Sequence, residues 1–139
     1  MFKTFSLSLI ALAALSFSSA QASELSINPG LWKTTTTTSN SFMDQPQTLT
    51  TEECVTETSF NPEEMTEELG ECEVVRNDIS DNTLTFGMTC SAEGNEVTVN
   101  GEYTAEDDTG HGTMDMNMSM QGMQMEINMQ WTSERIGDC

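Results

Sequence analysis

Methionine side chains are the feature of this sequence whose type and spacing most suggest chemistry. Seven of the 11 methionines fall between Met114 and Met129, where most alternate with polar residues. Thioether sulfur is a soft ligand, and soft ligands select Cu(I), and likewise Ag(I), over hard ions. If this segment forms a hairpin, opposite Cβ atoms lie about 5 Å apart, so several sulfurs can converge. The candidate metal ligands are Met118, Met120, Met123 and Met125, with His111 as a fifth.

Two other interpretations of these methionines stay open. Methionine fills irregular space in a protein core, and flexible methionine surfaces also suit the binding of apolar ligands. The first interpretation makes the segment the packed face of a sheet, and the second makes it the wall of a pocket. Simple packing leaves one choice unexplained, because valine or isoleucine would favour a strand more strongly than methionine does.

Acidity is the second feature. The chain of 139 residues has 23 Asp and Glu against 4 Lys and Arg, a formal net charge of −19. Nucleic acid binding is excluded, because a phosphate backbone is held by Lys and Arg. Most carboxylates are expected to form a solvated surface, and the sequence has no Asp-x-Asp-x-Asp-Gly calcium loop. The charge would also suit a role as partner or inhibitor of a cationic protein, through electrostatic steering.

Catalysis is not indicated by the residue types. A nucleophile, a base and an orienting group must share one cleft, but the only histidine is His111, which lies between two glycines. A single imidazole excludes any site that needs two or three. The four cysteines are expected to be cross-linked. We therefore expect a protein that is not an enzyme and that uses no cofactor.

The first 22 residues have the form of a secretory signal peptide. Lys3 precedes an apolar segment from Phe5 to Phe17, and Ala20-Gln21-Ala22 has the small residues that signal peptidase accepts. The apolar segment is too short to span a bilayer as a mature helix, and no lipid-attachment cysteine follows the cleavage point. The sequence predicts cleavage after Ala22, a periplasmic or secreted protein without stable membrane insertion, and a single β-rich domain over 23–139.

The elements that would position these groups are mainly strands. Apolar residues recur at every second position, which is typical of half-buried strands. In the clearest hairpin, Gln121-Gly122 forms a two-residue turn that places Met120 opposite Met123. About seven strands are predicted, over residues 31–38, 47–55, 71–77, 83–90, 97–103, 114–120 and 123–131. Short turns join them into an all-β antiparallel meander, which is expected to curl into a barrel or sandwich around its apolar face.

One short helix is predicted near residues 62–69. Asn61 can cap its first turn, and Pro62 suits the first helical position. Gly70 can end the helix in a left-handed conformation. The helix has about two turns, and we expect it to cover one end of the sheet.

Four cysteines in a chain predicted to reach an oxidising compartment indicate two structural disulfides. A turn near Asp81 places Cys72 opposite Cys90. The later strands alternate in direction, so Cys139 falls at the other end of the sheet from Cys90, beyond the roughly 7 Å that a bridge can span between Cα atoms. We predict the bridges Cys72–Cys90 and Cys54–Cys139. A Cys54–Cys72 bridge around the helix is the alternative.

The order of these motifs resembles a bacterial family. Pro29-Gly30-Leu31-Trp32 follows the predicted signal peptide, Cys54-Val55-Thr56 precedes the helix, and Arg135-Ile136-Gly137-Asp138-Cys139 closes the sequence. With the cysteine hairpin between them, these motifs are similar to the family called domain of unknown function 3617, over the whole of 23–139. The resemblance implies a small, exported, β-rich protein and supplies no catalytic residues.

The predicted export, the four cysteines and the alternating pattern of apolar residues together indicate the kind of function. We expect an exported envelope protein that acts as a structural or binding module stapled by two disulfides. Its expected partner is a small apolar ligand, a soft metal ion such as Cu(I) or Ag(I), or a cationic protein.

Overall fold

The structure is a computed structural model that describes residues 24–139; the predicted signal peptide lies outside these residues. The described chain is mostly strands with one short helix, so it is all-β as predicted. Its elements are β1 (Leu25–Ser26), β2 (Gly30–Asn40), β3 (Gln47–Val55), β4 (Ser59–Phe60), α1 (Pro62–Leu69), β5 (Glu71–Ser80), β6 (Thr83–Ala92), β7 (Asn95–Glu106), β8 (Thr109–Met120) and β9 (Met123–Gly137).

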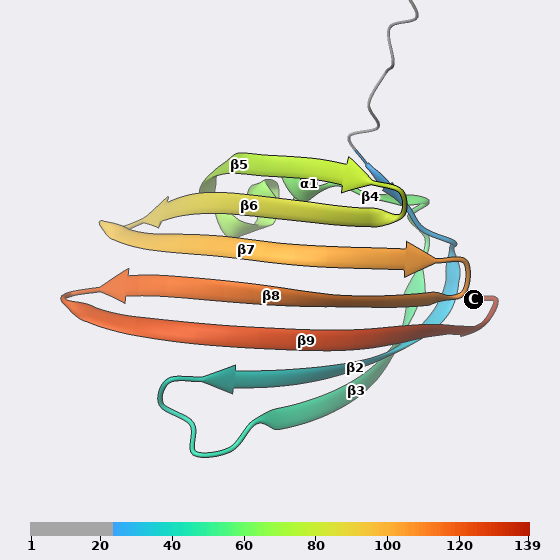
Figure 1. Cartoon of the computed structure of the whole chain (residues 1–139), viewed down its shortest axis with the longest axis horizontal. Helices are drawn as coiled ribbons and strands as arrows, with labels where there is room; N and C mark the ends of the chain where they lie inside the picture. The colour runs from blue at the N-terminus through green and yellow to red at the C-terminus, as the bar shows by residue number, and fades with distance from the viewer. Residues whose placement is uncertain (1–23) are drawn as a thin grey trace, which may run out of the picture.

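Seven strands form one antiparallel sheet in the order β3-β2-β9-β8-β7-β6-β5 (Figure 1). From β5 to β9 each strand pairs with the next, which is the predicted meander. The β2–β3 hairpin departs from a simple meander, because β2 pairs with β9 as well as with β3, and β3 forms an edge of the sheet in place of pairing with β5. The chain passes from β3 to β5 through β4 and α1.

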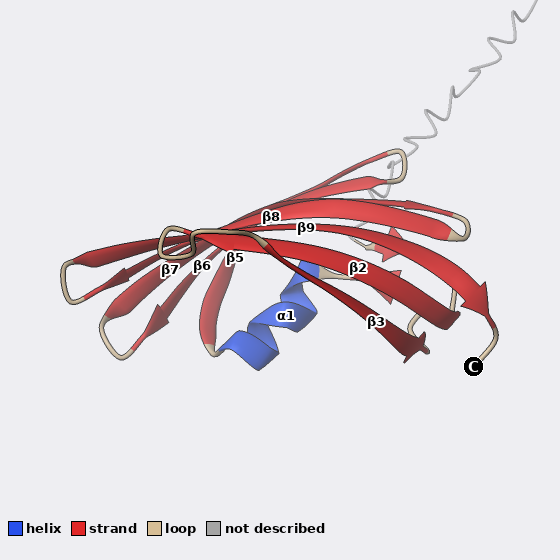
Figure 2. Ribbon diagram, turned by 90° about the horizontal axis from the view of Figure 1, so that it is seen from below, coloured by secondary structure: helices blue, strands red, loops and turns tan. Residues whose placement is uncertain are grey.

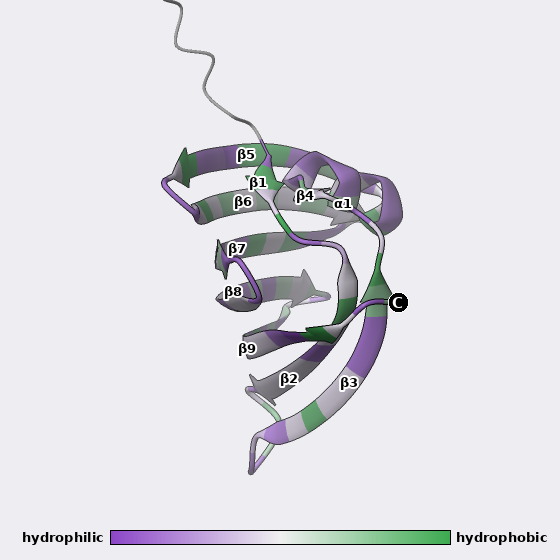
Figure 3. Ribbon diagram, turned by 90° about the vertical axis from the view of Figure 1, so that its right-hand side faces the viewer, coloured by the Kyte–Doolittle hydropathy of each residue, from purple (hydrophilic) through white to green (hydrophobic). Residues whose placement is uncertain are grey.

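The sheet is strongly curved but is not closed into a barrel (Figure 2). Closure would require the edge strands β3 and β5 to pair, and no ladder joins them in the described chain. Instead α1, β1 and β4 lie on the concave face, near β5 and β6 (Figure 3). The expected barrel or sandwich is therefore corrected to an open, curved sheet with a helix on its concave side.

The core lies on the concave face, where the short elements cover the sheet. Its buried cluster consists of Leu25, Leu84, Phe86, Met88 and Val99. Most of these residues come from alternate positions of β6, because side chains at every second position of a strand share a face. The Phe86 ring lies over Gly101, where an added Cβ would come within 2.4 Å of the ring. The glycine therefore makes room for a large ring on the neighbouring strand.

The helix α1 begins and ends where the sequence predicts. The Asn61 side-chain oxygen accepts a hydrogen bond from the backbone N–H of Glu63 at 3.0 Å. Pro62 is buried at the start of the helix. Gly70 follows its last residue with φ of 100° and ψ of −136°, a positive-φ conformation outside the left-handed helical region that the sequence predicts. In the part of the chain that the structure describes, no helix is long and apolar enough to cross a bilayer.

The structure contains two disulfides, in the pairing that the strand directions predicted. Cys72 and Cys90 face each other across β5 and β6, with Cα atoms 4.0 Å apart. Cys54, near the end of β3, bonds to Cys139, with Cα atoms 5.5 Å apart. The first bridge holds the hairpin that carries the core, and the second ties an edge strand to the end of the chain.

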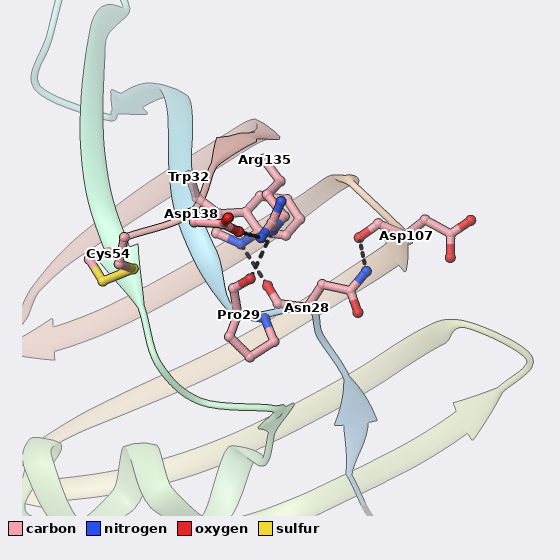
Figure 4. A network of polar contacts seen from close by, with 8 residues as sticks. Asn28, Pro29, Trp32, Cys54, Asp107, Arg135 and Asp138 are labelled. Carbon is pink, nitrogen blue, oxygen red and sulfur yellow. Dashed lines mark hydrogen bonds and ion pairs between the residues drawn. A yellow bond between two sulfur atoms is a disulfide. The ribbon is translucent and has the colours of Figure 1, made fainter.

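The motifs at the two ends of the described chain meet beside the second disulfide (Figure 4). The Trp32 indole N–H donates to the backbone oxygen of Asn28 at 2.8 Å. The Arg135 guanidinium donates to the backbone oxygen of Pro29 at 2.8 Å and pairs with Asp138 at 2.6 Å. These contacts give the motif residues a structural role, because they fix how the first long strand enters the sheet.

Candidate functional site

The β8–β9 hairpin brings the four predicted methionine ligands to one face of the sheet. Met118 lies opposite Met125, and Met120 lies opposite Met123. Both turn residues between the strands have positive φ, 50° and 82°, which fits the tight turn that fixes hairpin register. Positions an even number apart share a face of a strand, so all four side chains project from the concave face.

The tip of this hairpin is packed differently from its base. Met114 and Met116 are partly buried and pack against the core cluster. At the tip, Met120 is 44% exposed and Met123 is 62% exposed. Core packing therefore explains the methionines at the base, but it does not explain those at the tip.

His111 does not join the methionines, so the predicted five-residue ligand set is corrected to four. His111 pairs with Thr104 and Thr132, and it lies on β8 seven residues before Met118. An odd separation puts it on the convex face, and seven residues of strand span about 23 Å. The imidazole therefore lies on the wrong side of the sheet and too far from the sulfurs.

A cavity of about 340 Å³ opens between α1, β4 and the end of β3. Its lining mixes apolar side chains with carboxylates and includes no Lys or Arg. The apolar members are Ile27, Val55, Phe60 and Met65, and the acidic ones are Glu53, Glu57, Glu64 and Glu68. A lining of this kind suits a molecule that has both an apolar part and a cationic group.

The local structure explains how these side chains reach the cavity. Glu64 and Glu68 are four residues apart on α1, so they lie on the same side of the helix. Phe60 directly precedes the helix cap, and its ring packs against Tyr103 with centroids 5.7 Å apart. The cavity is thus formed by one face of the short helix and by the segment that leads into it.

The apolar surface extends from the cavity toward the methionine hairpin. Phe60 contacts Tyr103, and Tyr103 contacts Trp131 with ring centroids 5.8 Å apart. Burial raises the pKa of the Tyr103 phenol above its ordinary value. Trp131 lies on β9 two residues after Met129, on the same face of the strand. The aromatic rings therefore connect the cavity side of the concave face with the hairpin.

The cavity is not predicted by the sequence, because the glutamates of the helix are expected there to belong to a solvated surface. The spacing of Glu64 and Glu68, beside Met65, does indicate that one face of the helix is both acidic and apolar. The opposite wall of the cavity, at the end of β3, could not be predicted from the sequence. Its position depends on β2 pairing with β9, which brings the end of β3 round to the helix.

The described residues offer no other set of metal ligands. Within residues 24–139, no group of three or more His, Cys, Asp or Glu side chains is placed to hold a metal ion. The four cysteines are all in disulfides, so none offers a thiolate. The strand register places the four methionines of the hairpin tip in two directly opposite pairs, Met118 with Met125 and Met120 with Met123.

Fold and sites define a small all-β protein with two disulfides and a partly covered, curved sheet. A family model described as "Protein of unknown function (DUF3617)" matches residues 27–139, and the chain belongs to this family. The match confirms the resemblance seen in the motifs. Comparison with curated proteins and comparison with solved structures each found no match. The function must therefore be argued from the sites themselves.

Proposed function

We propose that this protein is an exported, non-enzymatic binding module whose concave face holds a small amphiphile with a cationic group. The observation that carries the proposal is the cavity beside α1, which is lined by apolar side chains and four glutamates and by no basic residue. Export is supported by the two disulfides, because such bonds persist in oxidising compartments. The predicted signal peptide agrees with this location.

The apolar part of the ligand has a suitable surface. The cavity volume of about 340 Å³ lies within the range of small-molecule sites. The aromatic row that begins at Phe60 extends the apolar surface beyond the cavity. Burial of each methylene group of a ligand would contribute about 0.8 kcal/mol, so an alkyl chain of moderate length suffices for measurable affinity.

The charged part of the ligand is favoured by carboxylates that have no cationic partner. Among the described residues there are two ion pairs, Arg76–Asp78 and Arg135–Asp138, and neither involves a cavity residue. A cation placed among these glutamates would therefore compete with no ammonium or guanidinium group. The net charge of −19 also attracts a cationic ligand over a distance.

Two features support binding rather than catalysis. The four cysteines are disulfide-bonded, and His111 lies on the convex face, away from the cavity. A cationic protein partner, the other expectation from the charge, has only the net charge in its favour. We therefore propose the small amphiphile.

Titration with three surfactants that share a dodecyl chain tests the proposal. Isothermal calorimetry is run below the micelle concentration with dodecyltrimethylammonium, dodecyl maltoside and dodecyl sulfate. We expect saturable binding at one site for the cationic compound, weaker binding for the neutral one and none for the anionic one. Equal binding of the anionic compound would contradict the charge preference, and no saturable binding of any of them would contradict the site.

Charge-matched variants separate a site from general attraction. Glu64→Gln with Glu68→Gln removes two cavity carboxylates, whereas Glu102→Gln with Glu106→Gln removes two exposed carboxylates from β7. The cavity variant should lose affinity for the cationic surfactant and the β7 variant should keep it. Equal losses in the two variants would mean that net charge alone drives binding. Intact mass of protein exported by its host tests the start at Ser23 separately.

A further inference from the structure

The tip of the β8–β9 hairpin combines soft donor atoms, a fixed register and access to solvent. Its four methionines form two adjacent cross-strand pairs on the concave face, Met118 with Met125 and Met120 with Met123. Directly opposite side chains have Cβ atoms about 5 Å apart, and neighbouring pairs on the same face are about 7 Å apart. The three rotatable bonds of methionine allow the sulfurs to converge on one point above the strands.

The exposure of the tip argues against packing as the reason for these residues. Met123 is 62% exposed and Met120 is 44% exposed, so these two bury less apolar surface than Met118 and Met125, which are half-buried. The methionines at the base, Met114 and Met116, pack on the core and have an ordinary explanation. A strand also favours β-branched residues over methionine. What the tip gains from methionine is a set of accessible thioethers.

We propose that this hairpin tip binds a soft monovalent metal ion, Cu(I) or Ag(I), through the thioether sulfurs of Met118, Met120, Met123 and Met125. Thioethers prefer soft ions to Zn²⁺, Ca²⁺ or Mg²⁺. The site lies at the turn of the hairpin and does not use the carboxylates of the cavity beside α1. It is therefore independent of the proposed amphiphile binding.

The chemistry of the donors gives the site two further properties. A thioether has no proton to lose, so metal binding should not change between about pH 7 and about pH 5, unlike binding through an imidazole group. His111 lies on the convex face, so its removal should have no effect on the metal. The acidic surface attracts cations in general, and its contribution is screened by salt.

Silver(I) is the probe, because it shares the softness of Cu(I) and is stable in air. The full chain, exported and carrying both disulfides, is titrated with silver nitrate in chloride-free buffer and followed by native mass spectrometry. Spectra of the methionine methyl groups are recorded in parallel. We expect one silver ion per chain, with shifts of the four tip methyls and unchanged signals from Met114 and Met129.

A leucine variant of the four tip residues keeps their apolar character but removes the sulfurs. Met118→Leu, Met120→Leu, Met123→Leu and Met125→Leu together should abolish stoichiometric silver binding while the dodecyltrimethylammonium titration is unchanged. The matched control, Met114→Leu with Met129→Leu, should bind silver as the wild type does. If the fourfold variant does not fold, the exposed pair Met120→Leu and Met123→Leu replaces it and should weaken binding.

The following results would contradict the proposed metal site. Silver uptake that is the same in the tip variant and the wild type would show that other groups bind the ion. Binding that disappears on acidification to about pH 5, or in His111→Asn, would assign the ion to the imidazole. A wild-type chain that forms no stoichiometric silver adduct would also refute the proposal.

Discussion

Tyr103 and Trp131 meet above the middle strand of the sheet, with ring centroids 5.8 Å apart. Between them on β8 lies Gly112, which is paired with Tyr103 on one side and with Trp131 on the other. An added Cβ at Gly112 would come within 2.3 Å of the Trp131 ring and 2.6 Å of the backbone oxygen of Glu102. The missing side chain lets the two rings close over the strand and join the core to the hairpin.

Replacement of Gly112 with alanine should therefore destabilise the protein. The Cβ would displace the Trp131 ring, and overpacking of this kind costs about 1 to 3 kcal/mol. Urea unfolding followed by tryptophan fluorescence measures the loss. Gly137→Ala is the matched control, because a Cβ there meets nothing within 4 Å. Similar free energies of unfolding for the two variants would contradict the packing argument.

The elements that the sequence predicts correctly are those with local signals. The helix has Asn61 as its cap and Gly70 at its end, and both signals lie within a few residues of the structure that they specify. The turn of the β8–β9 hairpin is encoded by the Gln121-Gly122 pair in the same way. The disulfide pairing required only the directions of consecutive strands, which follow from short turns.

The placement of β2 beside β9 could not be predicted, because its contacts join residues far apart in the sequence. Thr34 and Ser133 share a hydrogen bond of 2.9 Å across 99 positions, and a run of threonines carries little information about its partner. The cavity depends on this pairing and was missed with it. The position of His111, in contrast, could be predicted from the sequence, since its odd separation from Met118 already places it on the opposite face.

The Asn61 cap of α1 should contribute measurably to the free energy of unfolding. Asn61→Ala removes the oxygen that accepts the hydrogen bond from the N–H of Glu63, at a cost of about 1 kcal/mol. Asn61→Asp keeps an acceptor and should retain nearly all of the stability. Thermal unfolding of both variants provides the test, with hydrogen exchange of α1 as a local readout. An aspartate variant as unstable as the alanine variant would show that the cap does not matter.

The Cys54–Cys139 bridge should contribute strongly to stability, because it joins residues 85 positions apart. In the chain-entropy model a closed loop of this length stabilises the folded state by about 4 to 5 kcal/mol. Both cysteines are exposed, so Cys54→Ala with Cys139→Ala should lose little packing. Urea denaturation of the double variant measures the difference. A loss below about 1 kcal/mol would mean that the network around Arg135 already fixes this end of the chain.

Moderate salt should stabilise the protein. The described chain has 23 acidic side chains and only Lys33, Arg76 and Arg135 as basic ones. An increase in ionic strength from about 0.01 M to about 0.15 M shortens the Debye length from roughly 30 Å to roughly 8 Å. The repulsion between carboxylates should weaken by more than the attraction within the exposed Arg76–Asp78 pair. The melting temperature should therefore rise with sodium chloride, and a fall would show that attractive pairs dominate.

Tyr103 is the only tyrosine in the chain, so its ionisation can be followed directly. Burial raises its pKa, which means that the folded protein disfavours the phenolate. The unfolded chain ionises first as the pH rises through about 10. The stability that Tyr103 contributes is thus complete below that pH and is lost as the pH rises toward the folded-state pKa.

Absorbance titration of the phenolate tests this, with the urea-unfolded chain as reference. The native midpoint should be the higher of the two. Phe60→Ala removes the ring that packs on Tyr103 and should lower the midpoint toward the unfolded one, because water then reaches the phenol. Phe42→Ala, at a position that is 62% exposed, should leave it unchanged. Equal midpoints for native and unfolded protein would show that the phenol is hydrated, and that the aromatic row does not exclude water from the concave face.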